Sequence, residues 1–295
     1  MNSSKVFHKI VLGTAQFGLS YGIANTAGQV SRAETDSILS LAKQRGINTL
    51  DTAIAYGESE KVLGDIGIPD WQIISKLPAL PDAVVDVATW VDTQVAGSLQ
   101  RLRANRLHAL LLHRPSQLLE SRGGELYRAL VVQQERGAVE KIGISIYDTS
   151  ELDQLMPHMR FGVVQAPFNV LDARMIDSGW MERLEKMGCE LHVRSVFLQG
   201  LLLMSLDHRP TQFDRWQHLW TIWDAWLQDS GLTPLQACLR HALSTPGIAK
   251  VVLGIETTTQ LKQILMASQG DLPTVPDALK ICDPELLNPA LWKKT

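Results

Sequence analysis

The sequence contains little that points to secretion, zinc binding or a membrane. Its 295 residues include only three cysteines, Cys189, Cys238 and Cys282, which lie far apart and form no CxxC pair. Three isolated cysteines suggest neither a disulfide framework nor a zinc site. No run approaches the roughly 18 uninterrupted apolar residues that suggest a membrane-spanning helix, and the N-terminus has no signal-peptide pattern. We therefore expect a cytoplasmic protein with no membrane partner.

The sequence also lacks an excess of basic residues. Lysine and arginine total 28 against 31 aspartates and glutamates, which gives a net charge of -3. This balance argues against a strongly basic surface for nucleic acid. Hydrophobic residues make up 45% and charged residues 20%, which is ordinary globular composition and argues against disorder. We expect a single domain over residues 1–295.

What the sequence does contain is an alternation of short apolar runs with longer amphipathic segments. The runs predict strands over residues 9–14, 48–53, 71–77, 107–113, 141–146, 162–166, 190–197 and 248–254. Helical patterns cover residues 34–45, 58–66, 82–103, 125–136, 150–159, 174–187, 233–244 and 257–267. Strands that alternate with helices indicate a parallel sheet, and eight units in about 250 residues favour a (β/α)8 barrel. The predicted barrel covers about residues 9–267, followed by a tail over 268–295.

An open, doubly wound α/β sheet is the alternative arrangement. It would need a glycine-rich phosphate loop after the first strand, followed directly by a helix. The segment LGTAQFGLSYG lacks the GxGxxG spacing, and no helix is predicted directly after it. Ser31 and Glu34 have the spacing of a capping box, which predicts that the first long helix begins further on. The barrel is therefore the predicted fold.

Residues 198–232 form a longer connection than an ordinary barrel loop. Trp216, Trp220, Trp223 and Trp226 lie four, three and three residues apart, which places them on one stripe of a helix. We interpret the stripe as the packing of an inserted helix against the barrel. An aromatic wall over the substrate is the alternative, because long segments in barrels often cover the active site.

Polar residues at the ends of predicted strands are the candidate catalytic groups, because barrel enzymes place their active sites at the carboxyl ends of strands. Asp51 ends the second strand and Tyr56 follows it, Lys76 ends the third, and His113 ends the fourth. A free tyrosine, with a pKa of about 10, is a poor proton donor at neutral pH, and an adjacent lysine cation favours the phenolate. An aspartate can hold that lysine, and a neutral histidine can orient a carbonyl. The set suits protonation of a carbonyl oxygen while a cofactor delivers hydride to the carbon.

The sequence around these residues resembles the aldo-keto reductase superfamily. The segments LGTAQFGLSYG, DTAIAYGESEKVLG, SK, LLHRP, KIGIS, VVQAPFNVLD and QGLLL occur in the family's order and at its intervals. The resemblance implies NAD(P)(H)-dependent reduction of an aldehyde or ketone, or the reverse oxidation, on a (β/α)8 barrel. It implies that Tyr56 is the general acid/base, that Lys76 and Asp51 tune it, and that His113 orients the substrate.

The resemblance also implies a cofactor site at the ends of the other strands. Ser145 and Gln165 match positions that hold the nicotinamide carboxamide, although Ile146 replaces the asparagine that the family often has after the serine. Arg194 stands where many members stack a tyrosine on the nicotinamide, and a planar guanidinium can stack in its place. The other positions implied are Gly13, Thr14, Ser195, Phe197, Gln199, Gly200, Leu201, Gly254, Glu256, Thr257 and Gln260.

For the cofactor we expect NADP(H), which is the family's prevailing habit, with NAD(H) as the alternative. NADPH-preferring members usually place Lys or Arg after Gly254 for the 2′-phosphate. Here the segment offers Glu256 and threonines, with Lys262 as the nearest cation. Glu256 would repel a 2′-phosphate if it faces the adenosine ribose, and would have no effect if it points to solvent.

Two other functions fit a barrel of this kind. A nucleotide-binding regulatory subunit would bind the cofactor and modulate a partner protein, but the intact set of four catalytic groups argues against it. A lyase or isomerase would need a metal or phosphate site, which we do not find. The expected partner is a small-molecule carbonyl or alcohol, and substrate choice is expected to lie in residues 17–30, 78–82, 198–232 and 268–295. Neither the substrate nor the oligomeric state follows from the sequence.

Overall fold

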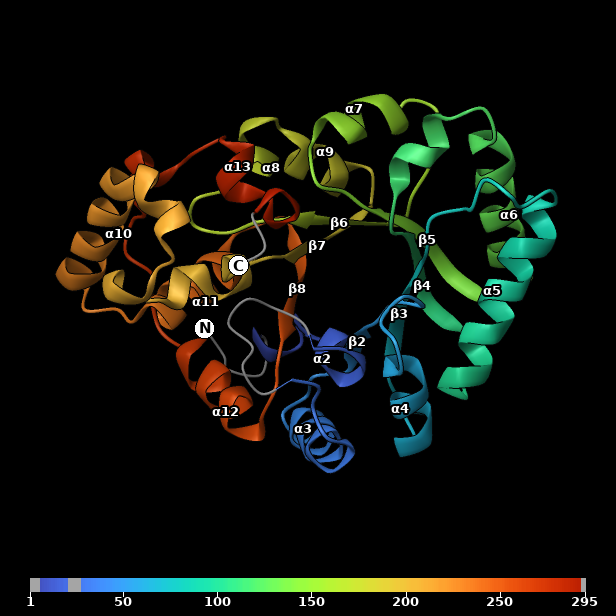
Figure 1. The fold of residues 1–295 in the computed structure, drawn as a ribbon, viewed down its shortest axis with the longest axis horizontal. Coiled ribbons are helices and arrows are strands. Elements are labelled where there is room, and N and C mark those ends of the chain that lie inside the picture. Colours follow the sequence, from blue (N-terminus) through green and yellow to red (C-terminus); the bar gives the residue numbers. More distant parts are fainter. Residues whose placement is uncertain (1–5, 21–27, 293–295) are drawn as a thin grey trace.

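The structure, a computed structural model, describes residues 6–20 and 28–292. Eight parallel strands form a closed barrel in which each strand pairs with the next along the chain and β8 pairs with β1 (Figure 1). The strands are β1 (Ile10–Gly13), β2 (Thr49–Asp51), β3 (Gln72–Leu77), β4 (Leu107–Leu112), β5 (Val139–Ser145), β6 (Val163–Pro167), β7 (Glu190–Arg194) and β8 (Ile248–Gly254). The predicted (β/α)8 barrel is confirmed, and the eight predicted runs correspond to these strands with slightly different ends.

Helices surround the barrel on its outer side (Figure 1). They are α2 (Ala15–Gly18), α3 (Arg32–Gln44), α4 (Ser59–Ile66), α5 (Val87–Leu102), α6 (Gly123–Glu135), α7 (Ser150–Leu155), α8 (Arg174–Asp177), α9 (Trp180–Lys186), α10 (Gln217–Ser230), α11 (Pro234–Ser244), α12 (Thr258–Ala267) and α13 (Pro284–Leu287). The single turn α2 lies inside the segment LGTAQFGLSYG and begins two residues after β1, and the first long helix, α3, begins at Arg32. The helix expected over 174–187 is two helices, separated at Gly179, which has the left-handed φ of 73° that glycine adopts without strain.

The Ser31 side chain caps the start of α3 as predicted, but the second half of the predicted capping box differs. Ser31 accepts a hydrogen bond from the Glu34 backbone N–H, as the expected capping box requires. The Glu34 carboxylate, however, accepts from the backbone N–H of Thr258 at the start of α12. The reciprocal half of the box is therefore replaced by a contact between two helices that are distant in sequence.

The barrel has apolar side chains on both faces of its strands. In β4, Ala109 and Leu111 belong to an interior cluster with Ile74 and Val163, whereas Leu110 and Leu112 belong to the core beneath the helices. Strand side chains alternate between the two faces, so an almost continuous apolar run is what a doubly buried strand requires. The interior cluster fills the barrel below the carboxyl ends of the strands, as expected for a packed barrel core.

Helix α10 and the tail lie together beside the barrel. Trp220 and Trp223 are fully buried, and the indole N–H of Trp220 donates to the Phe213 carbonyl at 3.0 Å. The indole of Trp226 donates to the Thr274 carbonyl at 3.1 Å and that of Trp216 to the Asp283 carboxylate at 3.1 Å. These contacts agree with the interpretation of the tryptophan stripe as packing, here largely against the tail.

Candidate active site

Three of the four candidate catalytic groups contact one another at the carboxyl ends of β2 and β3. The Lys76 ammonium donates to Asp51 Oδ1 at 2.5 Å, to the Thr52 carbonyl at 2.9 Å and to the Tyr56 hydroxyl at 3.5 Å. These three acceptors match the three hydrogens of the ammonium group. Asp51 and Lys76 are almost completely buried, whereas Tyr56 is partly exposed. The arrangement leaves the tyrosine hydroxyl as the accessible end of a buried ion pair.

The surroundings of Lys76 and His113 shift the pKa values of these two residues. Burial disfavours the Lys76 cation, but the Asp51 carboxylate and the Tyr56 hydroxyl outweigh it, and the pKa of Lys76 is raised. Burial, together with the cations of Lys76 and Arg194, lowers the pKa of His113 to about 4. The imidazole is therefore neutral at pH 7, and its ring lies edge-on to Tyr56 with the ring centroids 6.1 Å apart. A neutral histidine at this place can donate a hydrogen bond to an oxygen without carrying charge.

A close backbone contact positions Tyr56. Helix α2 lies against the loop after β2, and a Cβ atom at Gly18 would collide with the Tyr56 carbonyl oxygen. Beneath this loop the Ser59 hydroxyl donates to the Thr14 carbonyl at 2.9 Å. The segment after β1 is thus a support for the tyrosine loop as well as part of the cavity wall. Tyr21 and Gly22, at the end of the LGTAQFGLSYG segment, lie outside the described residues.

Gln165 joins this group to the opposite side of the barrel. Its amide nitrogen donates to Asp51 Oδ2 at 2.7 Å, and its amide oxygen accepts from the Ser145 hydroxyl at 3.3 Å. Asp51 therefore gives one carboxylate oxygen to Lys76 and the other to Gln165. The two residues expected to hold a carboxamide are in contact with each other and, through Gln165, with Asp51.

A cavity of about 520 Å³ opens at this end of the barrel. Near the candidate catalytic group it is lined by Asp51, Tyr56 and Gln165, and at its other end by Glu256, Gln260 and Gln263 of the loop before α12 and of α12 itself. The expected cofactor residues that line it are Gly13, Thr14, Gln165, Arg194, Ser195, Phe197, Gln199, Gly200, Gly254, Glu256 and Gln260. The strand register explains their grouping, because Gly13 pairs with both Asp51 of β2 and Gly254 of β8.

Three expected residues lie elsewhere. Ser145 is buried behind Gln165, and the Thr257 hydroxyl caps α12 by accepting from the Gln260 backbone N–H. Leu201 is fully buried in the core and does not line the cavity. The turn at Gln199 and Gly200, with φ of 53° and 96°, precedes it and separates it from the cavity-lining stretch.

The cavity wall after β7 is built from backbone in an unusual conformation. Ser195, Leu198 and Gln199 have φ values of 62°, 47° and 53°, which non-glycine residues rarely adopt. Each such residue costs about 1–2 kcal/mol, which contacts with its surroundings must offset. The Ser195 carbonyl accepts from the Asn169 amide at 3.2 Å, which is one such restraint. Strain of this kind concentrates at ligand sites.

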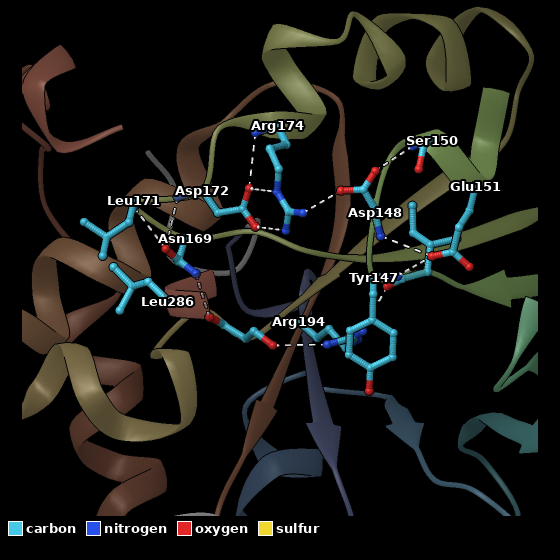
Figure 2. Close-up of polar contacts among 12 residues, drawn as sticks. Tyr147, Asp148, Ser150, Glu151, Asn169, Leu171, Asp172, Arg174, Arg194 and Leu286 are labelled. Atoms are coloured by element: carbon cyan, nitrogen blue, oxygen red, sulfur yellow. Dashed lines mark hydrogen bonds and ion pairs between the residues drawn. The ribbon is translucent and has the colours of Figure 1, made fainter. Parts of the chain in front are cut away.

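Arg194 presents a flat cation at the cavity edge. Its guanidinium lies 4.5 Å from the centre of the Tyr147 ring and donates to the Ile146 carbonyl at 2.9 Å (Figure 2). In the same view Arg174 is neutralised by Asp172 and Asp148. Within residues 6–20 and 28–292, Arg194 forms no ion pair. Its planar group is thus held by stacking and by hydrogen bonds.

Sequence reasoning missed several cavity residues. Gln16 of α2, Leu235 of α11 and Gln263 of α12 line the cavity beside the expected residues. Gln263 follows Gln260 by three positions on a helix, a spacing that places both side chains on one face and was a readable signal. Leu235 carried no local signal, because only the packing of α11 brings it to the cavity.

Two kinds of site are absent from the described residues. None of their helices has the length and apolar character needed to cross a membrane. Nor does any cluster of three or more His, Cys, Asp or Glu side chains among them suit a metal ion.

Comparisons with known proteins bear on this geometry. The family model for the aldo/keto reductase family matches residues 9–282. Among solved structures, the aldo-keto reductase AKR11C1 from Bacillus halodurans (holo form) is 17% identical, with a TM-score of 0.70 over 97% of this chain and 94% of that one. PA4992 from Pseudomonas aeruginosa, assigned as an aldo-keto reductase, is 23% identical, with a TM-score of 0.65 over 88% and 89%. No curated protein sequence matches.

At these identities the solved structures establish likeness of fold, whereas the family model covers most of the chain, from just before β1 to beyond α12. Its match includes every strand and all four candidate catalytic positions. The family in turn implies an oxidoreductase that uses a nicotinamide cofactor. This chain belongs to the aldo/keto reductase family.

Proposed function

We propose that this protein reduces an aldehyde or ketone to an alcohol, or catalyses the reverse oxidation, with a nicotinamide dinucleotide as hydride carrier. The observation that carries the proposal is the contact of the Lys76 ammonium with Asp51 and with the Tyr56 hydroxyl at the edge of the cavity. A proton donor backed by a buried cation suits a reaction that places negative charge on oxygen.

The residues present fit a dinucleotide. The cavity extends from Tyr56 to α12, and its walls offer amide and guanidinium groups from β6, β7 and α12 and hydroxyl groups of Thr14 and Ser195 from the loops after β1 and β7. Gln165, positioned by Ser145 behind it, would hold the carboxamide. Arg194 would lie against the nicotinamide ring, and the strained stretch from Ser195 to Gly200 would run along the pyrophosphate. When bound, the cofactor supplies or accepts hydride, which no side chain can do.

The chain's own groups perform the proton chemistry. Neutral His113 donates a hydrogen bond to the substrate carbonyl and orients its oxygen toward the Tyr56 hydroxyl. Tyr56 gives its proton to that oxygen as the carbonyl carbon is reduced, and Lys76 stabilises the phenolate left behind. Asp51 holds Lys76 in place and balances its charge. In the oxidation direction the same phenolate takes the alcohol proton.

Turnover tests this proposal directly. The purified protein should oxidise NADH or NADPH, followed by the loss of nicotinamide absorbance, with at least one member of a panel of aliphatic, aromatic and sugar aldehydes and ketones. Cofactor binding without turnover of any panel member would instead favour the regulatory subunit.

The three cysteines are free thiols, which supports the proposal of a cytoplasmic location, where thiols stay reduced.

A further inference from the structure

Two backbone N–H donors at the start of α12 are occupied by side chains of this chain. The backbone N–H of Thr258 donates to Glu34 Oε1 at 2.6 Å, and that of Gln260 donates to Thr257 Oγ1 at 3.0 Å. Just before the helix, the Glu256 N–H donates to the Gln260 amide oxygen at 2.8 Å. A helix start normally offers such groups to an anion. Here an added phosphate would have to displace internal partners.

Glu34 also supplies the negative charge that this helix end favours. The positive end of a helix dipole stabilises an anion close to its first turn. Glu34 reaches it from α3, 224 positions away in the sequence, and its side chain is partly buried. Its carboxylate therefore occupies the position at which the helix dipole would otherwise stabilise an external anion most strongly.

A second carboxylate strengthens the effect. Glu256 lines the cavity directly before α12 and lies 3.4 Å from the Gln260 amide nitrogen. Across the described parts of the chain, neither Glu34 nor Glu256 forms an ion pair with Lys, Arg or His. Glu256 thus lines this end of the cavity, and Glu34 lies at the start of α12 without belonging to the lining.

The position of the nicotinamide at the other end of the cavity determines which part of a dinucleotide lies near these carboxylates. Hydride transfer requires the nicotinamide beside Tyr56, so the adenosine lies toward Glu256, Gln260 and Gln263 of the same cavity. This step rests on the proposed function. A ribose hydroxyl can donate to a carboxylate, whereas a 2′-phosphate brings additional negative charge to it.

We propose that Glu34 is a specificity-determining residue that selects NAD(H) against NADP(H), with Glu256 acting in the same direction. The proposal departs from the NADP(H) expected from the family's habit. Glu34 acts from outside the β8–α12 segment, by occupying the helix start and by repelling the 2′-phosphate.

The test compares dissociation constants for NADH and NADPH, measured by calorimetric titration, in the wild type and in Glu34→Gln. The glutamine keeps an oxygen for the Thr258 N–H but removes the charge. The wild type should bind NADH more tightly, and the variant should bind NADPH relative to NADH about threefold to thirtyfold better. Glu256→Lys should shift the same ratio further toward NADPH. Asp36→Asn, an exposed change on the same helix, should leave the ratio unchanged.

Three results would count against this assignment in distinguishable ways. Tighter binding of NADPH by the wild type would overturn it. An unchanged ratio in Glu34→Gln, with a lower Tm and equal weakening of both cofactors, would make Glu34 a structural link between α3 and α12 and would also overturn it. Failure of the wild type to bind either dinucleotide would overturn the proposed function itself.

Discussion

At the scale of single residues, the site depends on the two hydrogen bonds that the Asp51 carboxylate accepts. One oxygen accepts from Lys76 and the other from Gln165. The candidate catalytic group and the expected carboxamide site therefore share one buried anion. Because Asp51 contacts both Lys76 and Gln165, a substitution at either of these residues should also alter the contact that Asp51 makes with the other.

Tyr56→Phe should separate chemistry from binding. The change removes the proton donor and keeps the ring volume, so turnover should fall by at least about 10²-fold, the lower range for general acid catalysis. Cofactor affinity should stay close to that of the wild type, because Tyr56 contributes only its hydroxyl to the reaction. Steady-state rates and a binding titration check both parts. Wild-type turnover in the variant would rule out Tyr56 as the proton donor.

Lys76→Met should affect alcohol oxidation most strongly. Without the ammonium group, Asp51 is a lone negative charge near the tyrosine and disfavours the phenolate that oxidation requires. The pH optimum for oxidation should rise or disappear, which a pH–rate profile measures. Removing one partner of a buried ion pair also costs about 3–5 kcal/mol, so circular dichroism must first show that the variant is folded. An unaltered oxidation profile in a folded variant would contradict this role.

At the scale of elements, the site depends on short segments that fit closely together. Helix α2 is one turn long, yet it supports the loop that carries Tyr56, because Gly18 leaves room for the Tyr56 carbonyl. The loop after β7 adds a second such element, in which three non-glycine residues hold left-handed backbone against the cavity. Each element is anchored by buried apolar side chains, Phe17 in α2 and Leu198 and Leu201 after β7.

Gly18→Ala should therefore lower activity without touching a catalytic group. The added methyl overlaps the Tyr56 carbonyl and forces α2 away from the tyrosine loop, at a cost of about 1–3 kcal/mol for such overpacking. We expect a lower Tm and a lower kcat, with Tyr56 displaced. Gly124→Ala in α6 is the matched control. A Cβ there meets nothing within 4 Å, and helix propensity should raise stability by about 0.5–1 kcal/mol. Equal behaviour of the two variants would contradict the close-contact explanation.

Elements were predictable where the signal is local, and were missed where it is not. The apolar runs indicated the strands, and the polar residues at their ends indicated Asp51, Lys76 and His113, because a parallel barrel brings such ends together. Glu34 had the local spacing of a capping box, but its carboxylate contacts Thr258 instead. No spacing within one helix predicts a partner 224 positions away. The single-domain division over residues 1–295 stays a prediction.

At the scale of the whole molecule, two partly buried histidines link stability to pH. Burial and the nearby Lys76 and Arg194 lower the pKa of His113 to about 4, and burial and Lys280 do the same for His241, which stacks on Phe168. An unfolded histidine has a pKa of about 6.5, so between pH 6.5 and 4 the unfolded chain binds protons that the folded chain does not. The stabilisation is complete above pH 6.5 and is lost as the pH falls toward 4.

We expect each of these two histidines to reduce the free energy of unfolding by about 1 kcal/mol between pH 7 and pH 5, after allowance for their partial exposure. Urea denaturation at pH 7, 6 and 5 measures this slope. His241→Phe, which keeps a ring against Phe168, should reduce the slope of unfolding free energy against pH by the contribution of His241. A slope that is the same in His241→Phe as in the wild type would show that His241 does not contribute.

The seam between β1 and β8 has a consequence for synthesis on the ribosome. Ile10 pairs with Val251, and the Val251 N–H donates to the Lys9 carbonyl at 2.8 Å. The strand β1, which is synthesised first, therefore cannot complete its pairing until β8 has been synthesised. Until β8 emerges, β1 and β7 each have an unpaired edge, and open edges are where chains associate wrongly. A nascent chain stalled before residue 248 should therefore bind chaperones, and release of the final strand converts two reactive edges into a closed barrel in one step.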